Sequence, residues 1–141
     1  MTERVFIDTN VLIYADDLDA GAKRDVARNA LRQVLGSRAF AAVLSTQVLQ
    51  EFFVVATRKL GVAPAVARRK IELLCRYDVV TVQPDLILGA IDLTRLQPIS
   101  FWDALIVKTA HAAGCGRILT EDLNHGDTID GVRIENPFLE G

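Results

Sequence analysis

The chain of 141 residues is 50% hydrophobic and 24% charged, and its 16 Lys and Arg against 18 Asp and Glu give a formal net charge of −2. This composition excludes a disordered chain and a protein that binds nucleic acid through its total charge alone. Two cysteines exclude a disulfide-rich scaffold, and no apolar run approaches the ~20 residues that span a bilayer. We therefore expect a single domain over residues 1–141 without a membrane segment, and the absence of a signal-like N-terminal segment favours the cytoplasm.

In chain order, the sequence predicts strands that alternate with helices. Short apolar or β-branched runs are typical of buried strands, whereas apolar residues that recur every three or four positions indicate one face of a helix. The expected elements are a strand at 5–7, a helix at 11–15 capped by Thr9 or Asn10, a helix at 22–35 ending at Gly36, a strand at 41–44, a helix from Ser45 or Thr46 to 58–59, a helix from Pro64 to about Arg76, a strand at 79–82, a helix from Pro84 to about Gln97, a helix from Ser100 through Ala113, a strand at 117–120, a loop at 121–131 and a strand at 132–134.

This alternation predicts an α/β fold in which a mostly parallel sheet is covered by helices on both faces. In sheets of this kind, ligands bind beyond the carboxyl ends of the strands. The residues that directly follow each strand are therefore the first candidates for a functional site.

Four carboxylates occupy such positions. Asp8 directly follows the first strand, Asp122 lies just past the strand at 117–120, and Glu51 and Asp103 lie in the early turns of two helices. Taken singly, each is explained as a turn residue, a helix-terminal residue or a solvent-facing side chain. Together they are more informative, because three of them lie in apolar sequence, where acids are rarely buried unless they are paired or bound to metal.

No cationic partner adjoins these acids in the sequence. Clustered carboxylates repel one another, and a divalent cation relieves that repulsion. Ligation by oxygen alone favours Mg²⁺ or Mn²⁺ over zinc. Such a centre suits phosphodiester hydrolysis, because the ion polarises the phosphate and lowers the pKa of a bound water.

Four segments, in this order along the chain, resemble the motifs of the PIN-domain ribonucleases: Asp8-Thr9-Asn10, residues 45–52, residues 101–106 and residues 119–124. The resemblance covers essentially the whole chain. It implies a three-layer α/β/α sandwich with a mostly parallel sheet and a metal-dependent endoribonuclease activity.

The resemblance also implies roles for individual residues. The four acids would be catalytic; Asp8, Asp103 and Asp122 would ligate the metal, and Glu51 would bind the ion or its waters or orient the attacking water. The polar residues that match supporting positions are Thr9, Asn10, Thr46 and Thr120. Asp127 competes with Asp122, the least constant acid of the family, and we interpret Asp127 as a loop residue.

Many PIN domains of this length are VapC-type toxins, so the resemblance also implies an antitoxin partner whose tail blocks the acidic site, and a homodimer. Two other interpretations remain open: a PIN nuclease of RNA processing, and a non-catalytic PIN domain that binds RNA or protein. The presence of all four acids disfavours the latter. A phosphatase with Asp8 as nucleophile is disfavoured by Asn10, because that chemistry wants a second aspartate two residues on.

Basic and aromatic residues offer candidate RNA contacts. The basic stretch formed by Arg58, Lys59, Arg68, Arg69 and Lys70 is predicted to contact the RNA backbone, with a solvated helix surface as the alternative. Trp102 is interpreted as a core or interface residue, with stacking on a base as the alternative. Apolar stripes at 22–35 and 85–97 are expected to face chiefly the core, with any surplus forming a dimer face or a groove for an antitoxin helix. Cys75 and Cys115 are interpreted as small apolar residues.

Overall fold

In the computed structural model, which describes residues 2–139, six strands form one sheet in the order β3-β2-β1-β4-β6-β5. Every neighbouring pair is parallel except β5 and β6, which run antiparallel. The strands are β1 (Glu3–Ile7), β2 (Phe40–Ser45), β3 (Asp78–Val80), β4 (Arg117–Leu119), β5 (Thr128–Ile129) and β6 (Val132–Glu135).

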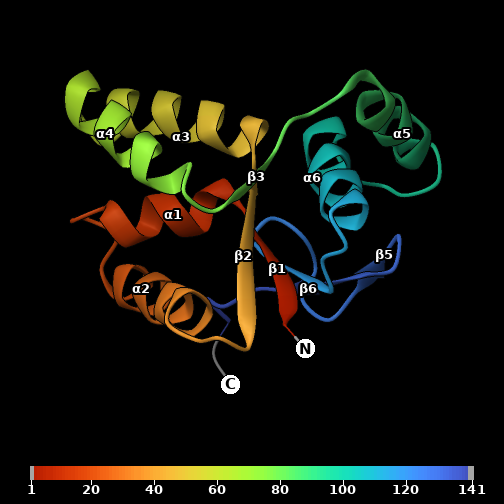
Figure 1. The fold of residues 1–141 in the computed structure, drawn as a ribbon, viewed down its shortest axis with the longest axis horizontal. Coiled ribbons are helices and arrows are strands. Elements are labelled where there is room, and N and C mark those ends of the chain that lie inside the picture. The colour runs from red at the N-terminus through yellow and green to blue at the C-terminus, as the bar shows by residue number, and fades with distance from the viewer. Residues whose placement is uncertain (1, 140–141) are drawn as a thin grey trace.

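Six helices cover this sheet on both faces within the same residues. Figure 1 shows α1 to α4 on one side of the sheet and α5 and α6 on the other. The helices are α1 (Thr9–Asp16), α2 (Ala22–Leu35), α3 (Thr46–Arg58), α4 (Pro64–Leu74), α5 (Pro84–Thr94) and α6 (Phe101–Ala112). The arrangement confirms the predicted α/β/α sandwich around a mostly parallel sheet.

The central strand β1 shows why the sheet needs both helical layers. Val5, Phe6 and Ile7 are consecutive, so their side chains point alternately to opposite faces, yet all three are almost completely buried. A strand with apolar residues on both faces is stable only where both faces are covered. The sheet core continues into β2 and β4 through Val43, Leu44, Ile118 and Leu119.

Several predicted boundaries differ from the structure for local reasons. The N-cap of α1 is Asp8, rather than Thr9 or Asn10, and its carboxylate accepts a hydrogen bond from the backbone N–H of Thr9. Strand β3 ends at Val80 instead of residue 82, because the N–H of Val82 donates to the Thr46 hydroxyl at 3.1 Å instead of to a neighbouring strand. The predicted loop at 121–131 contains the short strand β5.

Two further interpretations are corrected by exposure. Trp102 is 62% exposed and is therefore not a core residue. Cys75 is exposed, whereas Cys115 is buried as expected, and burial raises the pKa of the Cys115 thiol to about 11. No helix in the described part of the chain combines the length and apolar character needed to cross a membrane.

Candidate active site

The carboxyl ends of β1 and β4 bring the first and last of the four acids together. Ile7 pairs with Leu119 in the parallel register, so the two strands end level with each other. The backbone N–H of Asp8 extends this ladder by donating to the carbonyl of Leu119 at 3.0 Å. Asp8 and Thr120, which directly follow the two strands, therefore lie side by side although they are 112 residues apart.

Asp8 is buried at this edge, and neutral donors surround its carboxylate. Its Oδ2 accepts a hydrogen bond from the Thr120 hydroxyl at 2.8 Å, and its Oδ1 accepts one from the N–H of Thr9 at 2.7 Å. The pKa of Asp8 is raised from 3.8 to about 7, chiefly by burial and to a lesser extent by the nearby carboxylates of Asp122 and Glu51, whereas the two hydrogen bonds lower it. A buried carboxylate with no cation beside it is held at an energetic cost.

Thr120 and Asn10 connect Asp8 to Asp122. The N–H of Asp122 donates to the Thr120 hydroxyl oxygen at 3.1 Å, and the side-chain amide of Asn10 donates to Asp122 Oδ2 at 3.1 Å. The same amide lies 3.4 Å from Asp8 Oδ2. The Asn10 amide thus contacts both carboxylates, whereas the Thr120 hydroxyl joins the carboxylate of Asp8 to the backbone of Asp122.

Glu51 reaches the same edge from the second turn of α3. Its Oε2 accepts a hydrogen bond from the Thr9 hydroxyl at 3.0 Å, and its Oε1 accepts one from the side-chain amide of Gln47 at 2.8 Å. The Thr9 hydroxyl therefore contacts one of the acids. The Thr46 hydroxyl instead accepts a hydrogen bond from the N–H of Val82 in the connection between β3 and α5.

Asp103 stands apart from the other three acids. It lies in the first turn of α6, where its N–H donates to the Ser100 hydroxyl at 3.1 Å in the predicted helix cap. Partial burial raises the pKa of Asp103, and so do the carboxylates of Asp122 and Glu51, which places it within their electrostatic reach. It makes no side-chain hydrogen bond to them in the structure.

The loop that carries Asp122 is fixed from outside by a contact that the sequence did not reveal. Glu121 accepts a hydrogen bond from the Tyr14 hydroxyl at 2.5 Å and forms an ion pair with Lys23 at 2.8 Å. Its backbone N–H also donates to the side-chain oxygen of Asn10 at 3.3 Å. Nothing in the spacing of these residues signals that they meet, because they come from α1, α2 and the β4–β5 connection.

A cleft of about 670 Å³ opens beside the acids. Asp8, Glu51 and Asp122 line it, whereas Asp103 is not part of its wall. Its wall also includes residues 16–19, three of which are aspartates, and Lys59. The predicted site is therefore a concave, mainly acidic surface.

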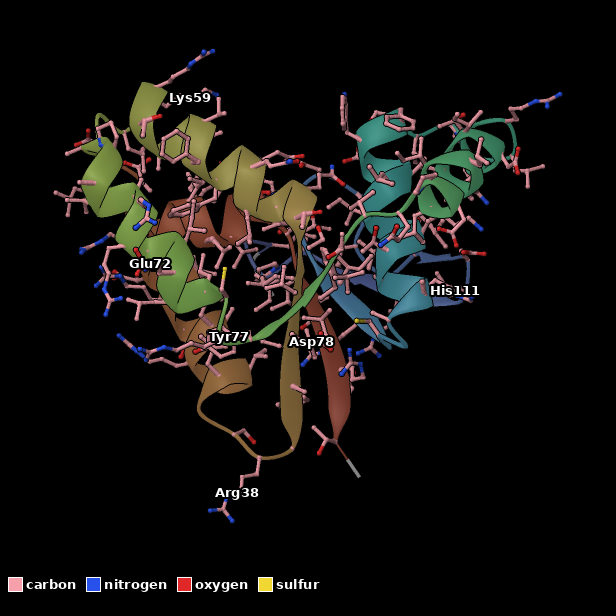
Figure 2. The ribbon with its side chains drawn as sticks, turned by 45° about the horizontal axis from the view of Figure 1, so that its top comes forward. Arg38, Lys59, Glu72, Tyr77, Asp78 and His111 are labelled. Carbon is pink, nitrogen blue, oxygen red and sulfur yellow. The ribbon has the colours of Figure 1, made fainter. Side chains whose placement is uncertain are left out.

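The predicted basic stretch divides into two groups. Figure 2 shows Lys59 at the far end of α3 and Glu72 on α4. Arg68 and Arg69 form ion pairs with Glu72, and Lys70 pairs with Asp16 at 3.2 Å. Arg58 and Lys59 form no ion pair within residues 2–139, so Lys59, which lines the cleft, is the best placed of the five for contact with a phosphate.

The carboxylates of the site carry negative charge that the described part of the protein does not itself balance. None of the ion pairs within residues 2–139 involves Asp8, Glu51, Asp103 or Asp122, so the four acids have no protein cation to balance them. The carboxylate oxygens themselves are the ligands that hard cations prefer, and the hydroxyl and amide groups around them donate hydrogen bonds to these oxygens. In the same residues, no three Asp, Glu, His or Cys side chains converge into a ready-made cluster of ligands. Carboxylate oxygens without a protein cation are the type of ligand that Mg²⁺ or Mn²⁺ takes, and waters would have to supply the rest of the coordination shell.

The pKa of Asp8 predicts how the chelator-treated protein responds to pH. The folded protein retains a proton on Asp8 up to about pH 7, whereas the unfolded chain releases it near 3.8. Raising the pH through this window therefore favours the unfolded state, and the free energy of unfolding should fall between about pH 4 and 7. Urea denaturation in excess EDTA at several pH values measures this fall. The fall in the free energy of unfolding should be smaller in Asp8→Asn. If the free energy of unfolding depends on pH in the same way in both proteins, Asp8 ionises without destabilising the folded state.

Comparisons with known proteins were made on sequence and on structure. A family model described as the PIN domain matches residues 5–129. Among solved structures, the fold is similar to VapC20 of Mycobacterium tuberculosis, described as a toxin that cleaves the sarcin-ricin loop, with a TM-score of 0.65, 21% identity and coverage of 81% of this chain and 86% of that one. No curated protein matches the sequence.

Two complexes are similar in fold over more of the chain. A toxin–antitoxin complex from Klebsiella pneumoniae has a TM-score of 0.68 and 21% identity, covering 95% of this chain and 98% of that one. VapBC2 from Rickettsia felis, bound to a DNA fragment from its promoter, has a TM-score of 0.63 and 19% identity, covering 94% and 98%. At these identities the likeness concerns the fold.

Proposed function

Since this chain belongs to the PIN-domain family, we propose that it is an endoribonuclease that uses Mg²⁺ or Mn²⁺ to hydrolyse RNA phosphodiester bonds, and that it is the toxin of a toxin–antitoxin pair. The observation that carries the proposal is the burial of Asp8 without a cationic partner, in one hydrogen-bonded network with Glu51 and Asp122. A structural carboxylate at this depth would be expected to have a protein cation beside it.

The position of each acid indicates its proposed role. Asp8 and Asp122, whose carboxylates both lie within hydrogen-bonding distance of the Asn10 amide, would hold the ion together with Asp103. Glu51, fixed on both oxygens by Thr9 and Gln47, would orient a water. When bound, the cation supplies a polarised phosphate and a water of lowered pKa. No side chain is expected to attack the phosphorus.

The toxin assignment is supported by likeness of fold to the Klebsiella and Rickettsia complexes, and it implies an antitoxin and a homodimer. Expression of the wild-type chain alone should arrest growth, and co-expression with the product of a neighbouring short reading frame should relieve the arrest. The Asp8→Asn chain should not arrest growth. Cleavage sites mapped in total RNA with and without the neighbour would identify the target. RNA cleavage in vitro without growth arrest would favour an RNA-processing nuclease instead.

The variant Thr120→Val tests whether the Thr120 hydroxyl holds Asp8 in position for the reaction. Valine preserves the shape of this fully buried side chain but removes the hydroxyl that donates to Asp8 and accepts the N–H of Asp122. Loss of such a supporting group typically reduces metal affinity or activity about 10–100-fold, and we expect a loss in that range. Initial rates of RNA cleavage across a Mg²⁺ titration measure it. Thr128→Val, at an exposed position in β5, is the control, and equal rates in the two variants would refute the role of Thr120.

A further inference from the structure

Gln47 is a buried polar residue in the first turn of α3, and although it lies within the segment 45–52, no role was predicted for it from the sequence. Its side chain is 5% exposed, and its amide nitrogen donates two hydrogen bonds. One goes to Glu51 Oε1 at 2.8 Å and the other to the backbone carbonyl of Trp102 at 3.3 Å. Spacing of four residues places Gln47 and Glu51 on the same face of the helix, so the first contact follows from the helix itself.

The second contact joins two parts of the site. Trp102 directly precedes Asp103 in the first turn of α6, and Figure 1 shows α3 and α6 on opposite sides of the sheet. Within residues 2–139, no other side-chain hydrogen bond connects these two helices. Gln47 is therefore the polar link between the helix that carries Glu51 and the turn that carries Asp103, the acid that the network around Asp8 does not reach.

The other end of the same amide has no partner. Gln47 Oε1 is buried and accepts no hydrogen bond in the structure. Buried acceptors in proteins are almost always satisfied, because an unpaired one loses its hydration without compensation. The oxygen belongs to the amide that contacts Glu51, so a proton donor such as a water at this point would also lie beside the Glu51 carboxylate.

We propose that Gln47 is a positioning residue of the carboxylate site. Its amide nitrogen fixes Glu51 and links it to the turn of Asp103, and its amide oxygen accepts a hydrogen bond from a water of the hydrated cation. The proposal rests on the function proposed above and adds a residue that sets the separation of Glu51 and Asp103. Glutamine fits this role because it donates and accepts through one planar group without adding charge.

The variant Gln47→Met distinguishes a positioning role of Gln47 from a role in packing alone. Methionine fills a similar volume, so a residue that only packs would tolerate it, and removal of the unpaired oxygen offsets part of the lost hydrogen bonding. We expect a melting temperature close to wild type, a fall in kcat of about 10–100-fold with little change in KM for RNA, and weaker Mn²⁺ binding. Gln47→Glu, which places a second carboxylate against Glu51, should reduce kcat further. Gln50→Met and Gln50→Glu, at an exposed position of α3, are the matched controls.

Mn²⁺ binding is measured by calorimetric titration of the chelator-treated proteins without RNA, so it does not depend on cleavage. If wild type binds Mn²⁺ but cleaves no RNA, the proposed function fails, and weaker binding by Gln47→Met than by Gln50→Met still supports the positioning role. If wild type cleaves RNA and Gln47→Met matches it in kcat and in Mn²⁺ affinity, the inference fails and the function stands. If a lower melting temperature alone explains the loss of activity and Mn²⁺ binding in Gln47→Met, Gln47 has a structural role and the inference is overturned. Absence of Mn²⁺ binding by wild type would overturn it as well.

Discussion

The Asp8→Asn variant is expected to fold normally and to lose RNA cleavage by about 10³-fold or more. Asparagine has the shape of aspartate; its amide oxygen can still accept the hydrogen bond from the Thr9 N–H, and its amide nitrogen can donate to the Thr120 hydroxyl oxygen. It removes the negative charge that would hold the cation. The loss should be this large because electrostatic stabilisation by a metal is worth several kcal/mol in the transition state.

The measurement for Asp8→Asn is the initial rate of cleavage of a single-stranded RNA, together with a thermal unfolding curve. Asp127→Asn is the matched control, because Asp127 is exposed in the same sequence region as Asp122 and makes no side-chain hydrogen bond in the described residues. We expect Asp127→Asn to cleave at the wild-type rate. Cleavage by Asp8→Asn at that rate, with an unchanged melting temperature, would remove Asp8 from the mechanism.

Excess EDTA is expected to abolish cleavage by the wild-type protein, and added Mg²⁺ or Mn²⁺ should restore it. The four acids have no protein cation within residues 2–139, so the positive charge that stabilises the transition state must come from the ion. Because water is the attacking group, the 2′-hydroxyl of the RNA should not be needed for the reaction.

A chimeric substrate distinguishes water from the 2′-hydroxyl. An RNA oligonucleotide with one 2′-deoxynucleotide on the 5′ side of its scissile bond should still be cut, and the all-RNA substrate should yield no 2′,3′-cyclic phosphate. The control is a nuclease that attacks through the 2′-hydroxyl, which cannot cut the chimera. Cleavage that persists in EDTA, or that fails on the chimera and leaves a cyclic phosphate, would replace metal-activated water with attack by the ribose.

Much of the fold followed from local patterns that tertiary structure did not override. Helix α2 has the predicted bounds, and Ser45 and Ser100 cap their helices through hydrogen bonds to Val48 and Asp103. These patterns are strong because the capping residue and the apolar face lie within a few positions of each other. Ligand sites form at the carboxyl ends of parallel strands, and this rule predicted that Asp8, Glu51 and Asp122 lie at one edge of the sheet.

The remaining features depend on partners far along the chain. Gln47 could have been noticed four residues before Glu51, but its bond to Trp102 depends on how α6 sits against α3. The contact of Thr46 could not be predicted for the same reason, because its partner Val82 lies 36 residues further along the chain. Periodicity shows that a helix has an apolar face without showing what covers that face.

Helix α5 illustrates that last point. The apolar stripe at 85–97 was expected to face the core, but only Ala90 and Leu93 of α5 are buried. Ile87, Leu88 and Ile91 are exposed, and Leu88 shows 63% of its surface. An exposed apolar face does not identify the partner that covers it, so the homodimer and the antitoxin contact remain predictions. Sedimentation of the purified chain and of a co-expressed complex would test them.

Titration of Mn²⁺ into the chelator-treated wild-type protein, in the absence of RNA, tests most directly whether the acids form a cation site. We predict saturable binding that is weakened at least about ten-fold in Asp8→Asn and is unchanged in Asp127→Asn. Equal affinity of the wild-type and Asp8→Asn proteins for Mn²⁺, or no binding to the wild-type protein, would contradict a metal centre built on Asp8.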